Sequence, residues 1–377
     1  MPALDVPWPR TEPAALTPSP ERQELRDSLR TLLTRHSDIE RVRAAAESEL
    51  GYDRELWRLL ATEMSVAAIA VPEHRGGLGY GTAELATVLE ECGRALAAAP
   101  VLTSAVLGAG ALLAADDRDT VHDLLPAVLE GELLATVSPL TGETDRLRAE
   151  PGPDGWMLSG TVTGVLGGAS AELLIALAAC PDGVRLFAAR LGPEVARARR
   201  TVIDPTRGQA DLTMDGTAAT ALTSPETTAA TVERLRDLAT LAVACENTGV
   251  IDRLLELTVE YTRARQQFGR PIASFQAIKH RLADLLVLLE RARSAARYAA
   301  AVYADDPGAA RLAVAVAGAV CTEAAVQAAA EAVQLHGGVG FTWEHAAHSY
   351  YRRALGNEAA HGSATEHRAR IAALLGL

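Results

Sequence analysis

The feature that most constrains the fold is a long helical pattern in the C-terminal part of the chain. From about Thr227 onward, apolar residues recur three and four positions apart, which is the spacing of a buried helix face. Alanine and leucine, which favour helix, dominate this part of the sequence. Three long helices and a shorter terminal one predict an antiparallel four-helix bundle over residues 225–377. The three long segments cover residues 227–268, 275–306 and 308–337.

The rest of the chain divides into three parts. Residues 1–20 are rich in proline and form a predicted extended arm. Residues 21–133 repeat the helical spacing around one glycine-rich loop, which predicts an N-terminal helical domain. Residues 134–224 carry short apolar runs separated by turn signals, as strands of an antiparallel β-domain do. The predicted fold class is therefore α+β and mostly α, with a β-domain between an N-terminal helical domain and a C-terminal helical bundle.

Composition excludes several classes of function. The net charge of -12 argues against a nucleic-acid partner. Lys279 is the only lysine, so an anionic ligand must be held by arginine, backbone N–H groups or helix N-termini. The four cysteines lie far apart without a CxxC pair, so neither a zinc site nor a disulfide framework is expected. The N-terminus lacks a signal-peptide core and no apolar run is long enough to span a membrane, so we expect a cytoplasmic protein without a membrane partner.

A first candidate site is the corner between the first two long helices, YTRARQQFGRPIASFQAIKH at residues 261–280. Gly269 is predicted to cap the first helix, and Pro271 prevents its continuation. Arg265 can reach an anionic group, and Phe268 offers an apolar face beside it. A Gly-Pro corner also occurs without any ligand, so the residue types alone leave a purely structural role open.

A second candidate site is the sequence QLHGGVGFTWEH at residues 334–345, where the third long helix ends. Gly337, Gly338 and Gly340 allow the backbone to pass close to a ligand, and Gln334 presents an amide one turn earlier. A glycine-rich helix terminus is also common without a ligand, so this motif is a weak signal by itself.

Taken together, the two motifs resemble those of the acyl-CoA dehydrogenases. The C-terminal domain of that family carries an RxxFG corner, a glutamine in the next helix and a QxxGGxG turn, and its helical, β, helical order matches along essentially the whole chain. The resemblance implies a tetramer in which each FAD lies across a subunit interface. It also implies an acyl-CoA substrate, an electron-transfer flavoprotein as the acceptor and no metal. The FAD-binding residues carried over are Arg265, Phe268, Phe275, Gln276, Gln334, Gly337 and Gly338.

The catalytic carboxylate of that family is missing. In the family, a carboxylate removes the α-proton of an acyl thioester while the β-hydride passes to the flavin. The usual base position after the QxxGG turn falls on His361, and the alternative position in the first long C-terminal helix falls on Ala239. Asp237 points to a different helix face, and Glu246 lies about two turns further along. His361 is therefore the catalytic candidate in place of a glutamate.

The predicted β-domain also departs from the family pattern. The family's Thr-Glu-Pro stretch, which contacts the flavin ring, corresponds to residues 137–141. A tryptophan placed against the ring corresponds to Gly164 or Val165, so aromatic stacking on the flavin is expected to be missing. Residues 204–207 and the TWEH sequence at 342–345 resemble an actinobacterial branch of the family that is built from two different subunit types.

These departures predict the base-lacking subunit of a heterotetramer that contains two copies of each of two homologous chains. Two alternatives stay open. A self-sufficient homotetramer could use His361 as its base, because an imidazole with a pKa of about 6.5 is a competent base at neutral pH. The second alternative is a flavin-free scaffold, although a scaffold would not need the intact Arg265 and Gln334 motifs.

Other polar side chains receive structural interpretations. His345 and His348 lack the glutamate and the spacing of a metal-binding HExxH motif. His280 follows a lysine on an amphipathic helix and is expected to be solvated. Glu90 and Glu91 are expected on a solvated helix face rather than as an acid-base pair.

Overall fold

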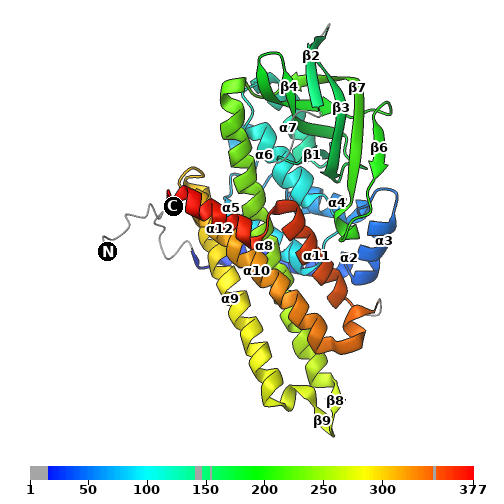
Figure 1. Cartoon of the computed structure of the whole chain (residues 1–377), viewed down its shortest axis with the longest axis vertical. Coiled ribbons are helices and arrows are strands. Elements are labelled where there is room, and N and C mark those ends of the chain that lie inside the picture. Colours follow the sequence, from blue (N-terminus) through cyan, green and yellow to red (C-terminus); the bar gives the residue numbers. More distant parts are fainter. Residues whose placement is uncertain (1–15, 141–146, 153–154, 343–344) are drawn as a thin grey trace, which may run out of the picture. The chain divides into compact units, whose positions relative to one another are not determined.

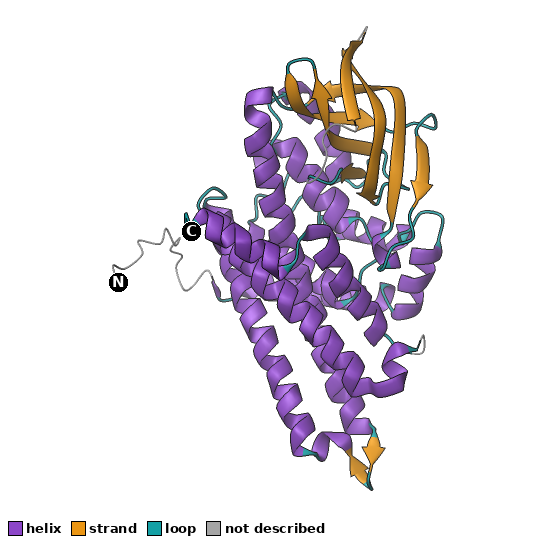
Figure 2. Cartoon of the chain, in the orientation of Figure 1, coloured by secondary structure: helices purple, strands orange, loops and turns teal. Residues whose placement is uncertain are grey.

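The computed structural model describes residues 16–140, 147–152, 155–342 and 345–377. The chain forms two compact units, and both combine segments that are distant in sequence. The predicted order of helices, strands and helices is confirmed (Figure 2). Unit 1 contains Met1–Ile39, Thr82–Ala97 and Thr240–Leu377, and unit 2 contains Glu40–Gly81 and Ala98–Ala239.

Unit 1 is a bundle of long helices with one small hairpin at the end of α8. In the bundle, α10 packs against α9, α11 and α12, while α5 packs against α2 and α9 (Figure 1). The predicted fourth helix is divided in two at Gly362, whose φ of 104° suits glycine, and Ser363 begins the last helix with a capping box. The helices are α2 (Pro20–His36), α5 (Thr82–Arg94), the later part of α8 (Pro225–Ala264), α9 (Gln276–Asp305), α10 (Arg311–His336), α11 (Ala347–His361) and α12 (Ala364–Leu374).

Two glycines let α5 and α8 cross at very short range. A Cβ atom on Gly93 would lie 2.1 Å from the carbonyl oxygen of Glu246, and one on Gly249 would lie 1.8 Å from that of Glu90. Any side chain at these positions would therefore force the helices apart. The contact brings the polar residues at the middle of α5 and α8 into the interior of unit 1.

Unit 2 combines short helices with a sheet of seven strands. Asp53 and Asp117 begin two of its helices, because each carboxylate accepts hydrogen bonds from backbone N–H groups of the first turn. The helices include α3 (Ile39–Glu47), α4 (Arg54–Arg58), the π-helical turns η1 (Leu59–Glu63) and η3 (Val101–Gly108), α6 (Ala109–Leu113), α7 (Arg118–Leu129) and the start of α8. The strands are β1 (Ala135–Val137), β2 (Leu147–Gly152), β3 (Gly155–Leu166), β4 (Leu173–Cys180), β5 (Gly183–Arg190), β6 (Ala196–Arg199) and β7 (Gln209–Ala221).

The strands of unit 2 pair in a closed cycle, β4–β2–β3–β7–β5–β4, so the sheet is a small barrel. Most pairs are antiparallel as predicted, but β1 runs parallel to β4, and β2 meets β4 in parallel at Arg148 and Ala179. Alternate residues point into the barrel, for example Leu174 and Ala176 of β4 and Leu212 of β7. Many of these core residues are alanines, as the narrow interior requires.

One helix qualifies by length and composition as a membrane span, which the sequence interpretation had missed. In the part of the chain that the structure describes, this is the segment Arg311–Phe341, which includes α10. About 72% of its most apolar window is buried inside the protein, against α9, α11 and α12. Such burial is typical of the core helix of a soluble protein.

Candidate functional site

The corner after α8 is a hairpin and not the predicted glycine cap. Strand β8 (Gln266–Gln267) pairs with β9 (Arg270–Pro271), and α8 already ends at Ala264. Phe268 and Gly269 form the turn with φ values of 54° and 75°. Two left-handed residues in succession are the signature of a tight hairpin turn, in which glycine is common and phenylalanine is rare.

The hairpin displays an aromatic and cationic surface. The Phe268 side chain is 91% exposed, and its ring lies 6.0 Å, centroid to centroid, from that of Phe275 in an edge-on contact. The Arg270 guanidinium stands 4.1 Å over the Phe275 ring. Arg265 is also exposed, and its guanidinium has no hydrogen-bond or ion-pair partner among the described residues. As predicted, Phe275 and Gln276 begin the next helix, where the Gln276 amide lies 3.0 Å from a ring nitrogen of His280.

The second motif ends α10 in an open turn. Gly337 has a φ of 63°, and a Cβ atom built on Gly337 or Gly338 would meet nothing within 4 Å. The Gln334 side chain is exposed and makes no hydrogen bond within the described chain. Because this backbone and this amide are uncovered, the turn is accessible to a ligand or to another chain.

A stack of aromatic rings joins the two motifs. The His336 ring lies 4.5 Å from Tyr261 on α8 and 4.2 Å from His345 (centroid distances). Burial and the neighbouring charges of His336, His348 and Arg253 lower the pKa of His345 to about 4. Burial also lowers the pKa of His336, whose Nδ1 lies 2.7 Å from the carbonyl oxygen of Ala332. This stack was not predicted, because no local sequence pattern indicates a ring contact between helix ends.

The predicted base position lies at the end of a helix. His361 is the last residue of α11 and is half-buried beside the left-handed Gly362. At the alternative position, Ala239 is a buried core residue. Glu246, considered and set aside as a base, is held in a buried ion pair with Arg353, and both side chains are almost fully excluded from solvent. The described residues therefore contain no carboxylate at either position that the family uses.

The interpretation of Glu90 and Glu91 as a solvated face was wrong. Both side chains are buried on α5, and Glu91 is only 1% exposed. Glu91 binds Arg26 and Arg30 of α2, each at 2.7 Å, and Glu90 binds Arg26 at the same distance. Burial raises the pKa of Glu90, but the charge and hydrogen bonds of Arg26 outweigh this effect and lower it below the usual value. These carboxylates hold helices together and are not free to exchange a proton with a substrate.

In unit 2, the stretch predicted to face the flavin ring offers no aromatic contact. Val137 and Ser138 are buried, and Thr141 lies outside the described residues. Gly164 has a φ of 69°, which an L-residue such as tryptophan rarely adopts, and Val165 is fully buried in the barrel core. Neither position can hold an aromatic ring against a flavin without a change in the local fold.

Comparison with known proteins places the chain in a family. Residues 19–132 match the model of the acyl-CoA dehydrogenase N-terminal domain, and residues 231–376 match that of the C-terminal domain. The chain belongs to the acyl-CoA dehydrogenase family, whose members are FAD-dependent oxidoreductases that act on CH–CH bonds.

One similar sequence and two similar solved structures agree with this family assignment. Acyl-CoA dehydrogenase IpdE2 of Mycobacterium tuberculosis is 37% identical over 91% of this chain and 93% of its own length. The ChsE4-ChsE5 complex of Mycobacterium tuberculosis includes a chain that is 32% identical, with a TM-score of 0.86 over 96% of this chain and 98% of that one. A variant of the Tcur3481-Tcur3483 steroid ACAD is 31% identical, with a TM-score of 0.84 over 96% and 99%.

Two groups of residues were expected to contact FAD: the two C-terminal motifs and the ring-contacting stretches of the β-domain. The residues present in the two motifs fit FAD. Arg265 supplies an exposed guanidinium without an internal partner, and Gln334 supplies an exposed amide. The open backbone at Gly337 and Gly338 would allow a phosphate or a nucleotide to approach closely. The ring-stacking half does not fit, because the position expected for an aromatic residue falls on Gly164 or Val165.

Proposed function

We propose that this chain is the base-lacking subunit of a heterotetrameric acyl-CoA dehydrogenase and completes the FAD site of a homologous catalytic chain. One observation carries this proposal: the two halves of the family's site differ in this chain. In the family, one set of residues contacts the FAD of a neighbouring subunit. In this chain that set is intact and exposed, and Arg265, Phe268 and Gln334 are examples. In the half that would serve its own flavin, the base position falls on His361 and the stacking position falls on Gly164 or Val165.

Each exposed group has a role suited to its chemistry. The Arg265 guanidinium would donate charge-assisted hydrogen bonds to the FAD pyrophosphate, and the amides of Gln276 and Gln334 would contribute neutral ones. Phe268 would offer a flat apolar surface, and the Gly337–Gly338 backbone would leave room for the cofactor. When bound, FAD supplies the hydride acceptor for α,β-desaturation of an acyl-CoA thioester, while the partner's carboxylate takes the α-proton.

The relatives support a two-chain enzyme. Two of the similar structures are complexes of two named proteins, and one of these is described as a steroid ACAD. We infer for this chain a homologous catalytic partner, a cytoplasmic location and an electron-transfer flavoprotein as the acceptor.

Co-purification tests the proposal directly. The chain is purified alone and together with a homologue from the same genome that keeps the glutamate after its QxxGG turn. We expect the lone chain to carry little flavin and no activity, and the complex to carry one FAD for each pair of chains. Full FAD occupancy and dehydrogenase turnover by the lone chain would overturn the proposal.

Substitution of His361 separates the proposal from the homotetramer alternative. In the complex, His361→Ala should leave the turnover number within about two-fold, because the partner's carboxylate acts as the base. Loss of nearly all activity, with FAD content unchanged, would instead support His361 as the base of a self-sufficient enzyme.

A further inference from the structure

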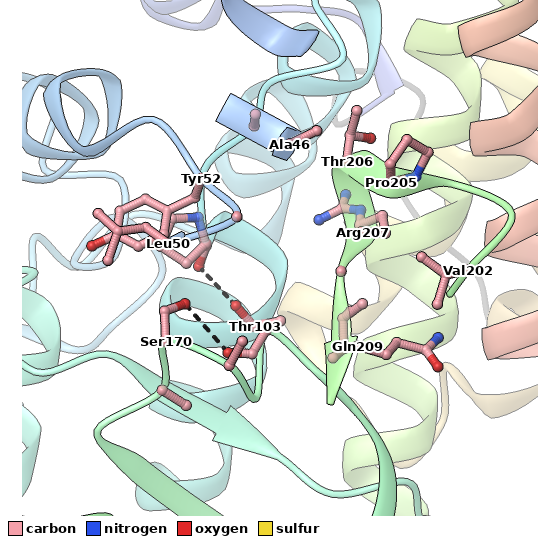
Figure 3. A pocket seen from close by; sticks show the side chains of 18 of the residues that line it. Ala46, Leu50, Tyr52, Thr103, Ser170, Val202, Pro205, Thr206, Arg207 and Gln209 are labelled. Carbon is pink, nitrogen blue, oxygen red and sulfur yellow. Dashed lines mark hydrogen bonds between the residues drawn. The ribbon is translucent and has the colours of Figure 1, made fainter. Parts of the chain in front are cut away.

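Unit 2 contains a pocket of about 260 Å³, and all of its lining residues belong to unit 2. It lies between the segment after α3, the start of η3, the β3–β4 connection and the segment 199–209 before β7 (Figure 3). A pocket of this kind suits a compact organic molecule.

One side of the pocket is apolar. Leu50 follows α3, Ala98 and Pro100 precede η3, Leu134 precedes β1, and Leu166 ends β3. In Figure 3, Leu50 lies across the pocket from the segment that carries Val202 and Thr206. A molecule bound here would bury apolar surface against this side, which favours a ligand with a hydrocarbon body.

The opposite side is basic. Three arginines line the pocket, Arg199, Arg200 and Arg207, whereas none of its lining residues is acidic. In Figure 3 the Arg207 guanidinium points from the segment before β7 toward the interior of the pocket. Arg200 is only loosely neutralised, since its guanidinium is 3.3 Å from Asp211 and its side chain is 48% exposed. A guanidinium presents parallel N–H donors that match a carboxylate, so this side favours an anionic head group.

Hydroxyl groups complete the lining between the two sides. The Thr103 and Ser170 hydroxyls lie at the pocket, each 3.4 Å from a carbonyl oxygen of its own loop (Figure 3). Burial raises the pKa of the Tyr52 phenol, so that this group stays neutral and adds no negative charge. The pocket thus combines a neutral polar middle with one apolar and one cationic side.

We propose that this pocket binds a small amphipathic carboxylate, such as a free medium-chain carboxylic acid, with its carboxylate toward Arg207 and its hydrocarbon body against Leu50, Pro100 and Leu166. The ligand class differs from an acyl-CoA thioester, because the free acid carries a negative charge on its two carboxylate oxygens, whereas the thioester carbonyl is uncharged. It also differs from inorganic phosphate, which would leave the apolar side unused. Each chain would thereby carry a site for an unesterified acid in addition to its part of the FAD site.

Isothermal titration calorimetry of the purified full chain with decanoate tests this site. We expect saturable one-to-one binding that falls at least ten-fold in Arg207→Gln and measurably in Arg200→Gln, while Arg58→Gln, on α4 outside the pocket, leaves it unchanged. Methyl decanoate and inorganic phosphate should bind much more weakly than decanoate. The Arg200 variant keeps the test decisive if circular dichroism shows that Arg207→Gln does not fold.

Three results would overturn the proposal. One is the absence of saturable decanoate binding to the folded chain. Another is binding that survives both arginine substitutions, since the head group would then lie elsewhere. The third is displacement of decanoate by riboflavin, because the pocket would then accept a flavin ring and not an acid. None of these results depends on the catalytic partner or on FAD, so the test is independent of the heterotetramer.

Discussion

The middle and the C-terminal end of α8 place polar side chains in opposite situations. In the middle of the helix, Glu246 is buried with Arg353, and the Asn247 side chain accepts a 2.9 Å hydrogen bond from Asn357. At the C-terminal end, Arg265 and the nearby Phe268 are exposed, and Arg265 has no partner among the described residues. The interior groups are paired within the fold, whereas the exposed Arg265 guanidinium makes no such internal contact in the described part of the chain. The contrast separates residues kept for folding from residues available for binding.

Breaking the buried pair should produce the largest loss of stability. Glu246→Ala leaves the Arg353 charge buried without its partner, which costs about 3–5 kcal/mol of unfolding free energy. The double variant Glu246→Leu, Arg353→Met removes both charges and should recover much of that loss. Urea unfolding followed by circular dichroism measures both. Equal destabilisation in the single and double variants would show that the pair's hydrogen bonds, and not an uncompensated charge, are what stabilise this region.

At the exposed end, Arg265→Ala should weaken FAD binding without weakening the fold. Loss of a hydrogen bond to a charged group is worth about 1.5–3 kcal/mol, or roughly ten- to a hundred-fold in the FAD dissociation constant of the complex. The unfolding free energy of the chain should change by less than about 0.5 kcal/mol, because the residue is exposed. Arg263→Ala, an exposed arginine two residues earlier, is the matched control. If both variants bind FAD equally, Arg265 has no special role.

The ring stack between the two motifs should make unit 1 sensitive to acid. The folded pKa of His345, about 4, lies below the usual 6.5, so the unfolded chain binds the extra proton first. The stability from this group is complete above pH 6.5 and is lost as the pH falls toward 4. The slope should stay below about 1.4 kcal/mol per pH unit, because the site is partly open to water. His345→Gln should flatten the profile of unfolding free energy against pH, and an unchanged slope in the variant would assign the acid sensitivity to other groups.

The sequence revealed the helices and both motifs, because these depend on local spacing. It did not reveal that Glu90 and Glu91 are buried, since their partners Arg26 and Arg30 lie more than sixty residues away and leave no periodic signal. The parallel pairing of β1 with β4 was missed for the same reason. The hairpin after α8 was predicted as a helix cap, because no sequence pattern indicates a left-handed phenylalanine. Sequence spacing thus described the helices and their exposed termini better than it described the interior.

The smallest predicted effect concerns the strained turn at the exposed end of α8. Phe268 adopts a left-handed conformation, which costs an L-residue on the order of 1–2 kcal/mol, and its ring is almost fully exposed. Because no burial in the lone chain compensates for this backbone strain, we infer that Phe268 serves to bind another molecule. Phe268→Asn gives the Asn-Gly turn that this hairpin favours, so stability should stay equal or rise by less than about 1 kcal/mol.

The same substitution should weaken FAD binding by the complex only a few-fold, since the loss of one exposed aromatic contact is worth about 0.5–1.5 kcal/mol. Phe268→Tyr keeps the ring and serves as the control for both measurements, thermal unfolding of the chain and flavin fluorescence titration of the complex. A drop in stability without any change in flavin affinity would contradict this prediction. The hairpin would then stabilise the fold, as the buried middle of α8 does, and would not bind FAD.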